Sequence, residues 1–215
     1  MTMSTETVAI KMGAPADVAR ALENACIKFG ITTQNQKSHF LGQIFVESGS
    51  FKTLRESLNY SVEGVMKTFS RARISEADAK KYGRTATQKA NQQALANILY
   101  GGMWGLNNLG NSKEGDGWAF IGRGLKQLTG RSNYTACSLA LYGDDRLVKN
   151  PALLEQLPDA ALSAGWFWSS RGLNSLAESN SYEQVTRKIN GGLNGYDARV
   201  AATKKAYALF ESLKG

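Results

Sequence analysis

Residues 33–49 read TQNQKSHFLGQIFVESG and carry the clearest helical pattern in the chain. Thr33 and Gln36 have the spacing of a capping box, in which two side chains satisfy backbone amides at the start of a helix. Apolar residues then recur with the period of one helix face until Gly49, a residue type that commonly ends helices. We therefore predict an amphipathic helix here, with Glu47 in its last turn.

The same apolar period recurs on both sides of this segment. Each of the three prolines precedes such a pattern, at a position where the start of a helix tolerates proline. The predicted helices cover about 16–29, 33–49, 61–69, 86–100, 132–142, 151–157, 158–170, 182–190 and 196–213. Residues 101–130 are too rich in glycine and asparagine for a regular helix and are predicted to be loop, with at most a small hairpin. We therefore expect a mainly α protein.

The composition is that of a folded globular domain. With 215 residues, of which 42% are hydrophobic and 20% charged, the chain differs from disordered sequences and is long enough for one full-sized core. No repeat or linker marks a second module. No apolar run approaches the ~20 residues of a membrane span, and residues 1–25 lack the apolar segment of a signal peptide. We expect synthesis in the cytoplasm and no stable membrane insertion.

The net charge of +8 favours polyanionic partners, such as nucleic acid, anionic lipid or anionic cell-wall polymer. Nucleic-acid binding is the remote alternative, because no predicted helix combines a dense basic face with interleaved aromatic residues. The basic helix at 196–213 is a candidate for membrane disruption, although core packing explains its apolar face better. Cys26 and Cys137 match no metal spacing and are interpreted as buried small hydrophobic side chains, with a disulfide between them as the less favoured alternative.

Carboxylates are the candidate catalytic groups, since the one histidine, His39, cannot form a multi-histidine metal centre and is interpreted as a packing residue. Glu47 borders the apolar face at the end of its helix, where desolvation and the helix dipole favour a protonated side chain. Glu56 lies in a polar segment beside Arg55, where we expect an ionised side chain. Two carboxylates in such unlike environments suit glycosidic bond cleavage. The rival carboxylates are Glu63, Glu76, Asp78, Glu114 and Asp116.

Residues 115–134, GDGWAFIGRGLKQLTGRSNY, have the composition of a carbohydrate site. Glycines on both sides of Arg123 allow close backbone approach, and Trp118 and Tyr134 offer aromatic faces to sugar rings. The neutral hydrogen-bonding side chains of the segment are Gln127, Thr129 and Asn133. The alternative is a tight turn braced by the arginine.

Five motifs, in order, resemble the family 19 glycoside hydrolases of the class I chitinase type, and most closely the phage endolysins of that family. They are FVESG (45–49), LNYS (58–61), GRGLKQLTGRSNY (122–134), NPALLEQLPDAALSAGWFW (150–168) and INGG (189–192). The resemblance implies a bilobed, lysozyme-like helical fold with a central cleft. It implies a single catalytic domain over 1–215, with a smaller lobe at roughly 55–115 and no separate cell-wall-binding module.

The resemblance also implies roles for individual residues. Glu47 matches the family's general acid, and Glu56 matches the general base that holds the attacking water. The matches to polar cleft residues that bind sugar or water are Gln127, Thr129, Asn133 and Asn190. No metal or other cofactor is expected.

Two positions depart from the family pattern. Val46 stands where relatives often have histidine. An arginine that braces the base in plant enzymes falls, by count from INGG, at Thr203. The candidates to replace it are Arg199, Lys204 and Arg55.

The expected activity is hydrolysis of the β-1,4 bond between N-acetylmuramic acid and N-acetylglucosamine in peptidoglycan. The short interval between Glu47 and Glu56 is of the endolysin type and argues for cell-wall glycan over chitin. A chitinase and a lytic transglycosylase, which needs one catalytic acid, remain alternatives. We expect a monomer, which is the default for an enzyme that acts on a meshwork polymer. The resemblance implies that it is made in a host cytoplasm and reaches the wall through a separate pore.

Overall fold

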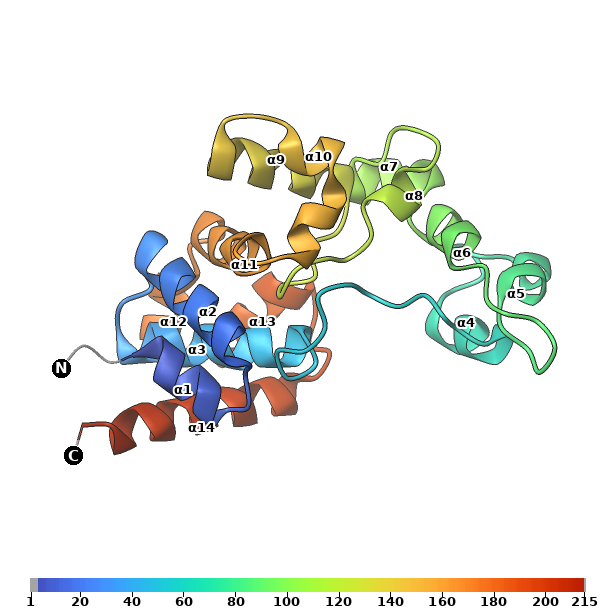
Figure 1. Ribbon diagram of the computed structural model, residues 1–215. Coiled ribbons are helices and arrows are strands. Elements are labelled where there is room, and N and C mark those ends of the chain that lie inside the picture. The colour runs from blue at the N-terminus through green and yellow to red at the C-terminus, as the bar shows by residue number, and fades with distance from the viewer. Residues whose placement is uncertain (1–3, 215) are drawn as a thin grey trace. The chain divides into compact units, whose positions relative to one another are not determined.

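The computed structural model describes residues 4–214 and consists of helices joined by connections of varied length, among them the long segment 48–61 between α3 and α4 (Figure 1). Residues 1–3 and 215, at the two ends of the expected single domain, lie outside the described part. Within the described part, β-structure is limited to isolated bridges such as Arg123 with Leu128, and no helix there is long and apolar enough to cross a membrane. The predicted mainly α fold is confirmed.

The chain divides into two compact units. Unit 1 comprises residues 4–54, 124–127 and 152–214, and unit 2 comprises residues 55–123 and 128–151. The helices of unit 1 are α1 (Thr5–Lys11), α2 (Ala16–Lys28), α3 (Gln34–Glu47), α11 (Asp159–Ser170), α12 (Leu173–Glu178), α13 (Tyr182–Asn190) and α14 (Tyr196–Ser212). The helices of unit 2 are α4 (Val62–Thr68), α5 (Glu76–Tyr82), α6 (Gln92–Leu99), α7 (Gly102–Leu109), α8 (Asp116–Ala119), α9 (Arg131–Tyr142) and α10 (Arg146–Lys149). A short 3-10 helix, η1 (Pro151–Glu155), follows α10 in the chain.

Unit 1 is organised around α3, whose last residue is Glu47. Figure 1 shows α14 beside α3. Their close approach requires Gly42, because a Cβ there would overlap the Thr203 hydroxyl of α14 and lie 2.6 and 2.7 Å from Thr203 backbone atoms. Phe40 of α3 also meets the ring of Trp168 in α11 edge-on, at a centroid distance of 5.5 Å. Packing from α14 and α11 therefore fixes the helix that presents Glu47.

Unit 2 has a hydrophobic core of its own. The buried residues of this core are Leu58, Val65, Ile74, Ala79, Leu95, Ala96, Leu99 and Ile121. The core holds the end of α6, which Tyr100 follows directly, and the segment before Gly122. These two places supply hydrogen bonds to Glu56, so the core of unit 2 positions that carboxylate.

Most of the predicted helices form near their expected bounds. In α3 the Gln36 amide donates to the Thr33 hydroxyl at 3.2 Å and the Thr33 amide donates to the Gln36 side chain at 3.2 Å, which confirms the capping box. The helix predicted at 86–100 begins only at Gln92. The helices α1, α5, α10 and α12 were not predicted, because short helices often lack a clear apolar period.

The prediction of loop over 101–130 is wrong for two stretches, which form α7 and α8. Gly110 ends α7 with a φ of 66°, and Gly115 precedes α8 with a φ of 83°. The Asp116 carboxylate then accepts the backbone amides of Ser112 and Lys113 at 3.0 Å, which fixes the turn before α8. Some glycines of this segment thus delimit helices, whereas the prediction took them as signs of irregular structure.

The cysteines and the histidine are packing residues in the structure. Cys26 and Cys137 are buried and are not joined in a disulfide, as predicted, and burial raises the pKa of the Cys26 thiol to about 12. His39 is 1% exposed, with its Nε2 atom 3.2 Å from Asn180 Oδ1 and its ring 4.6 Å from that of Tyr182. These contacts fit the packing role proposed for His39.

Candidate active site

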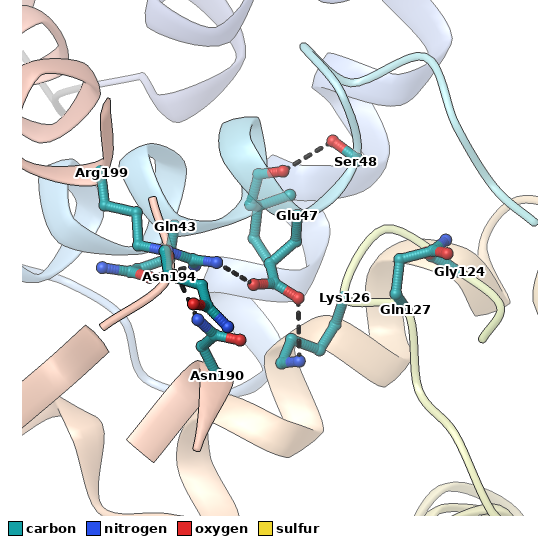
Figure 2. Close-up of polar contacts among 10 residues, drawn as sticks. Gln43, Glu47, Ser48, Gly124, Lys126, Gln127, Asn190, Asn194 and Arg199 are labelled. Carbon is teal, nitrogen blue, oxygen red and sulfur yellow. Dashed lines mark hydrogen bonds and ion pairs between the residues drawn. The ribbon is translucent and has the colours of Figure 1, made fainter. Parts of the chain in front are cut away.

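The carboxyl group of Glu47 lies between two cationic side chains of unit 1 (Figure 2). Arg199 of α14 donates from Nη2 to Glu47 Oε1 at 2.6 Å, and Lys126 donates from Nζ to Glu47 Oε2 at 3.1 Å. The three side chains are 12%, 5% and 9% exposed, respectively. The sequence argument for Glu47 considered desolvation and the helix dipole only, so the structure adds two charged donors to its surroundings.

Arg199 is held rigidly by groups other than Glu47. Its Nη1 donates to Gln43 Oε1 at 2.7 Å, and its Nε donates to the Asn194 carbonyl at 3.0 Å. Gln43, one turn before Glu47 on α3, donates in turn to the Thr186 hydroxyl at 3.2 Å. This network fixes the guanidinium group and, through it, the orientation of the Glu47 carboxyl group.

Lys126 is held in the loop 124–127. Gly124 has a φ of 74°, and a Cβ there would lie 2.9 Å from the Ser163 hydroxyl, so this turn needs glycine. The Lys126 ammonium group lies 4.7 Å from the centre of the Phe167 ring, a cation–π contact. Burial lowers the pKa of Lys126 below its usual value, although the neighbouring Glu47 carboxylate acts in the opposite direction.

Two of the predicted polar site residues belong to unit 1. Asn190 ends α13 and donates to the Asn194 carbonyl at 3.1 Å, which is the same oxygen that binds Arg199. Figure 2 shows Asn190 beside this network. Gln127 has a φ of 58°, and its side-chain amide donates to the Gly124 carbonyl of its own loop at 2.9 Å. The structure therefore joins Asn190 to the surroundings of Glu47.

Glu56 belongs to unit 2 and has a different set of donors. The Tyr100 hydroxyl donates to its Oε2 at 2.9 Å, and the Gly122 amide donates to its Oε1 at 2.6 Å. Burial, and then the charge of Glu56, raise the pKa of Tyr100 above its usual value, which keeps this hydroxyl protonated as a donor. Neutral donors from unit 2 thus orient Glu56, whereas cations surround Glu47.

Among the other site residues predicted in unit 2, the structure supports some of the proposed roles and contradicts one. The Asn133 amide donates to the Thr129 carbonyl at 2.8 Å, so these two lie together, and both are half-buried. Tyr134 is fully buried and donates to the Ile121 carbonyl at 2.6 Å, so the idea that its ring stacks on a sugar is wrong. Arg123 donates to the Ala119 carbonyl and the Tyr134 hydroxyl, which supports the bracing role considered for it.

The position expected for a bracing arginine has another role here. Thr203 is buried against Gly42, and its hydroxyl has no hydrogen-bond partner within the described chain. Arg199, one turn earlier on α14, binds Glu47. The Arg55 guanidinium lies 5.0 Å from the centre of the Trp118 ring. Arg199 therefore binds the carboxyl group of Glu47, and the identity of the residue that braces Glu56 stays a prediction.

Sequence reasoning missed three residues around the carboxyl groups, namely Lys126, Gln43 and Tyr100. Lys126 is 79 positions from Glu47, and Tyr100 is 44 positions from Glu56, so only the tertiary fold brings them together. No local signal identified Lys126, because its segment was predicted to be loop and a lysine in a loop is usually exposed.

No protein-family model matches the chain. A protein of Haemophilus influenzae described as "Glycosyl hydrolase family 19 domain-containing protein" is 39% identical over 184 residues, which cover 85% of this chain and 84% of that protein. Chitinase C from Streptomyces griseus HUT6037 has a similar structure, with a TM-score of 0.54 and 21% identity, covering 98% of this chain and 76% of that one. A bacterial family 19 chitinase gives a TM-score of 0.56 and 19% identity, covering 99% and 95%. These structural similarities confirm the expected lysozyme-like helical fold.

Proposed function

Because this chain belongs to glycosyl hydrolase family 19 and is a glycoside hydrolase, we propose that it hydrolyses the β-1,4 bond between N-acetylmuramic acid and N-acetylglucosamine in bacterial peptidoglycan. The observation that carries the proposal is the contrast between two carboxyl groups. Glu47 is held by two cations, whereas Glu56 is held by a hydroxyl and a backbone amide. Carboxyl groups in unlike environments take different roles in glycoside hydrolysis.

In this proposal Glu47 donates a proton to the leaving oxygen, and Glu56 activates a water molecule that attacks the anomeric carbon. The half-buried donors and acceptors that bind sugar or water are Gln127, Thr129, Asn133 and Asn190. The network around Arg199 supports the role of Glu47, because a general acid works only in a fixed orientation.

Peptidoglycan is preferred over chitin as the substrate because of charge. The chain carries +8, and the bacterial envelope is anionic, whereas chitin is a neutral polymer. We further propose that the enzyme acts as an endolysin. It would work as a monomer, be synthesised in a host cytoplasm and meet the wall after release through a separate pore.

Parallel digestion of purified peptidoglycan and of chitin tests the substrate. We expect muropeptides with a reducing N-acetylmuramic acid end from peptidoglycan, and a much lower rate on chitin. Fragments ending in 1,6-anhydro sugar would show a lytic transglycosylase. Cleavage of chitin alone would favour the second candidate, a chitinase, which the names of the two structural neighbours support.

A further inference from the structure

Lys126 is an unusual neighbour for a general acid. Its side chain is 9% exposed, and its Nζ atom lies 3.1 Å from Glu47 Oε2. Burying a lysine costs free energy, and a simple brace for a carboxylate does not need a second buried cation when Arg199 is already present. The contact therefore places against Glu47 a buried amine that, unlike an arginine side chain, can lose its proton.

The hydrogen bonds at Glu47 restrict where a proton can sit. Arg199 donates to Oε1 and does not lose its proton in proteins, so Oε1 keeps accepting. A proton on Oε2 must be donated to an acceptor, and a charged lysine has no lone pair. A neutral Lys126 amine can accept the hydrogen bond of such an Oε2–H group, whereas a charged Lys126 can only donate to the remaining lone pair of Oε2.

The surroundings of Lys126 favour its neutral amine form. Burial is the largest influence and lowers the pKa of Lys126, and the positive charges of Arg199 on α14 and Arg171 after α11 act in the same direction. Glu47 at the end of α3 acts against them. These are the charged groups that face Lys126 from the neighbouring helices.

We propose that Lys126 is a positioning residue that supplies Glu47 with the proton for the leaving group, an inference that rests on the proposed role of Glu47. In the resting site Lys126 is an ammonium ion and Glu47 a carboxylate. The Nζ–H bond breaks and an Oε2–H bond forms, which leaves a neutral amine and a carboxylic acid. Glu47 then transfers this proton to the glycosidic oxygen, and solvent returns a proton to Lys126 before the next turnover.

The pH dependence of kcat in Lys126→Met separates this role from a bracing role. If Lys126 supplies the proton of Glu47, the fall of the wild-type kcat at high pH reports the loss of that proton from the Lys126–Glu47 pair. In Lys126→Met a carboxylic acid alone sets that limb, so we expect it to move to lower pH by at least about one unit. If Lys126 only braces Glu47, loss of its positive charge makes Glu47 easier to protonate, and the limb moves to higher pH. A higher or unchanged limb overturns the proposal.

Lys126→Arg provides a second test, because arginine keeps the positive charge but releases no proton. We expect kcat to fall by at least about 100-fold with little change in KM, since general acid catalysis contributes that much. A bracing role predicts activity near that of the wild type. The matched controls are Lys205→Met and Lys205→Arg, which change an exposed lysine on α14 and should leave both profiles unchanged.

Two further measurements make the outcome independent of folding and of the proposed function. In the unmodified enzyme, ¹⁵N NMR of the lysine side chains should show Lys126 titrating at the pH of the high-pH limb, and a clearly different midpoint contradicts the proposal. Glu47→Gln should be inactive if Glu47 is the general acid. Full activity of Glu47→Gln would refute the proposed function itself, whereas an inactive Glu47→Gln with a raised limb in Lys126→Met refutes only the role of Lys126.

Discussion

At the scale of single residues, the two carboxyl groups differ in the charge of their donors. Lys126 and Arg199 surround Glu47 with positive charge, whereas Tyr100 and the Gly122 amide give Glu56 neutral hydrogen bonds. Hydrogen bonds to a charged group contribute about 1.5 to 3 kcal/mol each, so either set orients its carboxylate firmly. Removal of one donor should therefore affect activity without unfolding the chain.

Tyr100→Phe tests the neutral hydrogen bonds to Glu56. The variant keeps the buried ring and removes only the hydroxyl that donates to Glu56 Oε2. We expect the rate of peptidoglycan cleavage to fall about tenfold or more, because one hydrogen bond to a charged group is lost. Tyr82→Phe, the same change at a half-buried tyrosine of unit 2, is the control. Equal rates for both variants would show that Tyr100 does not position Glu56 for catalysis.

His39 gives a pH dependence of stability. Burial lowers its pKa, so the folded chain binds the proton less readily than the unfolded chain does. The stability that His39 contributes as a neutral side chain is fully present above about pH 6.5. As the pH falls below that value, the free energy of unfolding decreases by up to about 1.4 kcal/mol per pH unit. Urea titrations between pH 7 and 5 should show a smaller loss of unfolding free energy for His39→Gln than for the wild type. Equal losses would contradict this account.

At the scale of helices, the pairing of α3 with α14 links the fold to the site. Glu47 ends α3, Arg199 lies on α14, and Gly42 allows the two helices to approach. A change in their spacing would move the cation relative to the carboxyl group. The position of Arg199 relative to Glu47 therefore depends on a glycine elsewhere on α3.

Gly42→Ala should show this dependence. The new Cβ would overlap the Thr203 hydroxyl and approach its backbone, so α14 must shift. We expect a loss of about 1 to 3 kcal/mol in unfolding free energy from overpacking, together with a fall in activity. Adding Thr203→Ala should not restore either quantity, because the backbone contacts remain. Restoration by the double variant would show that only the hydroxyl matters.

The helices themselves were largely predictable from local pattern. The capping box at Thr33 and the apolar face up to Gly49 defined α3, since both signals are local in sequence. Short helices such as α7 and α8 were not predictable, because glycines at their ends look like loop until packing is known. The burial of Tyr134 could not be predicted either, since an aromatic residue suits a sugar-binding site as well as a hydrophobic core.

At the scale of the whole molecule, the chain assigns its carboxyl groups to separate units, with Glu47 in unit 1 and Glu56 in unit 2. Family motifs identified both residues, but their partners lie far away in sequence. Arg199 is 152 positions from Glu47, and such distances leave no local pattern to read. The division into a single domain with a smaller lobe at roughly 55–115 stays a prediction.

The most direct test is digestion of purified peptidoglycan in ¹⁸O-labelled water, followed by mass spectrometry of the fragments. The wild type should place one heavy oxygen on each new N-acetylmuramic acid end, because water attacks the anomeric carbon. Glu47→Gln should release such ends at least about 100-fold more slowly while keeping its helical content. Unlabelled anhydro ends, or labelled ends released by Glu47→Gln at the normal rate, would contradict hydrolysis driven by Glu47.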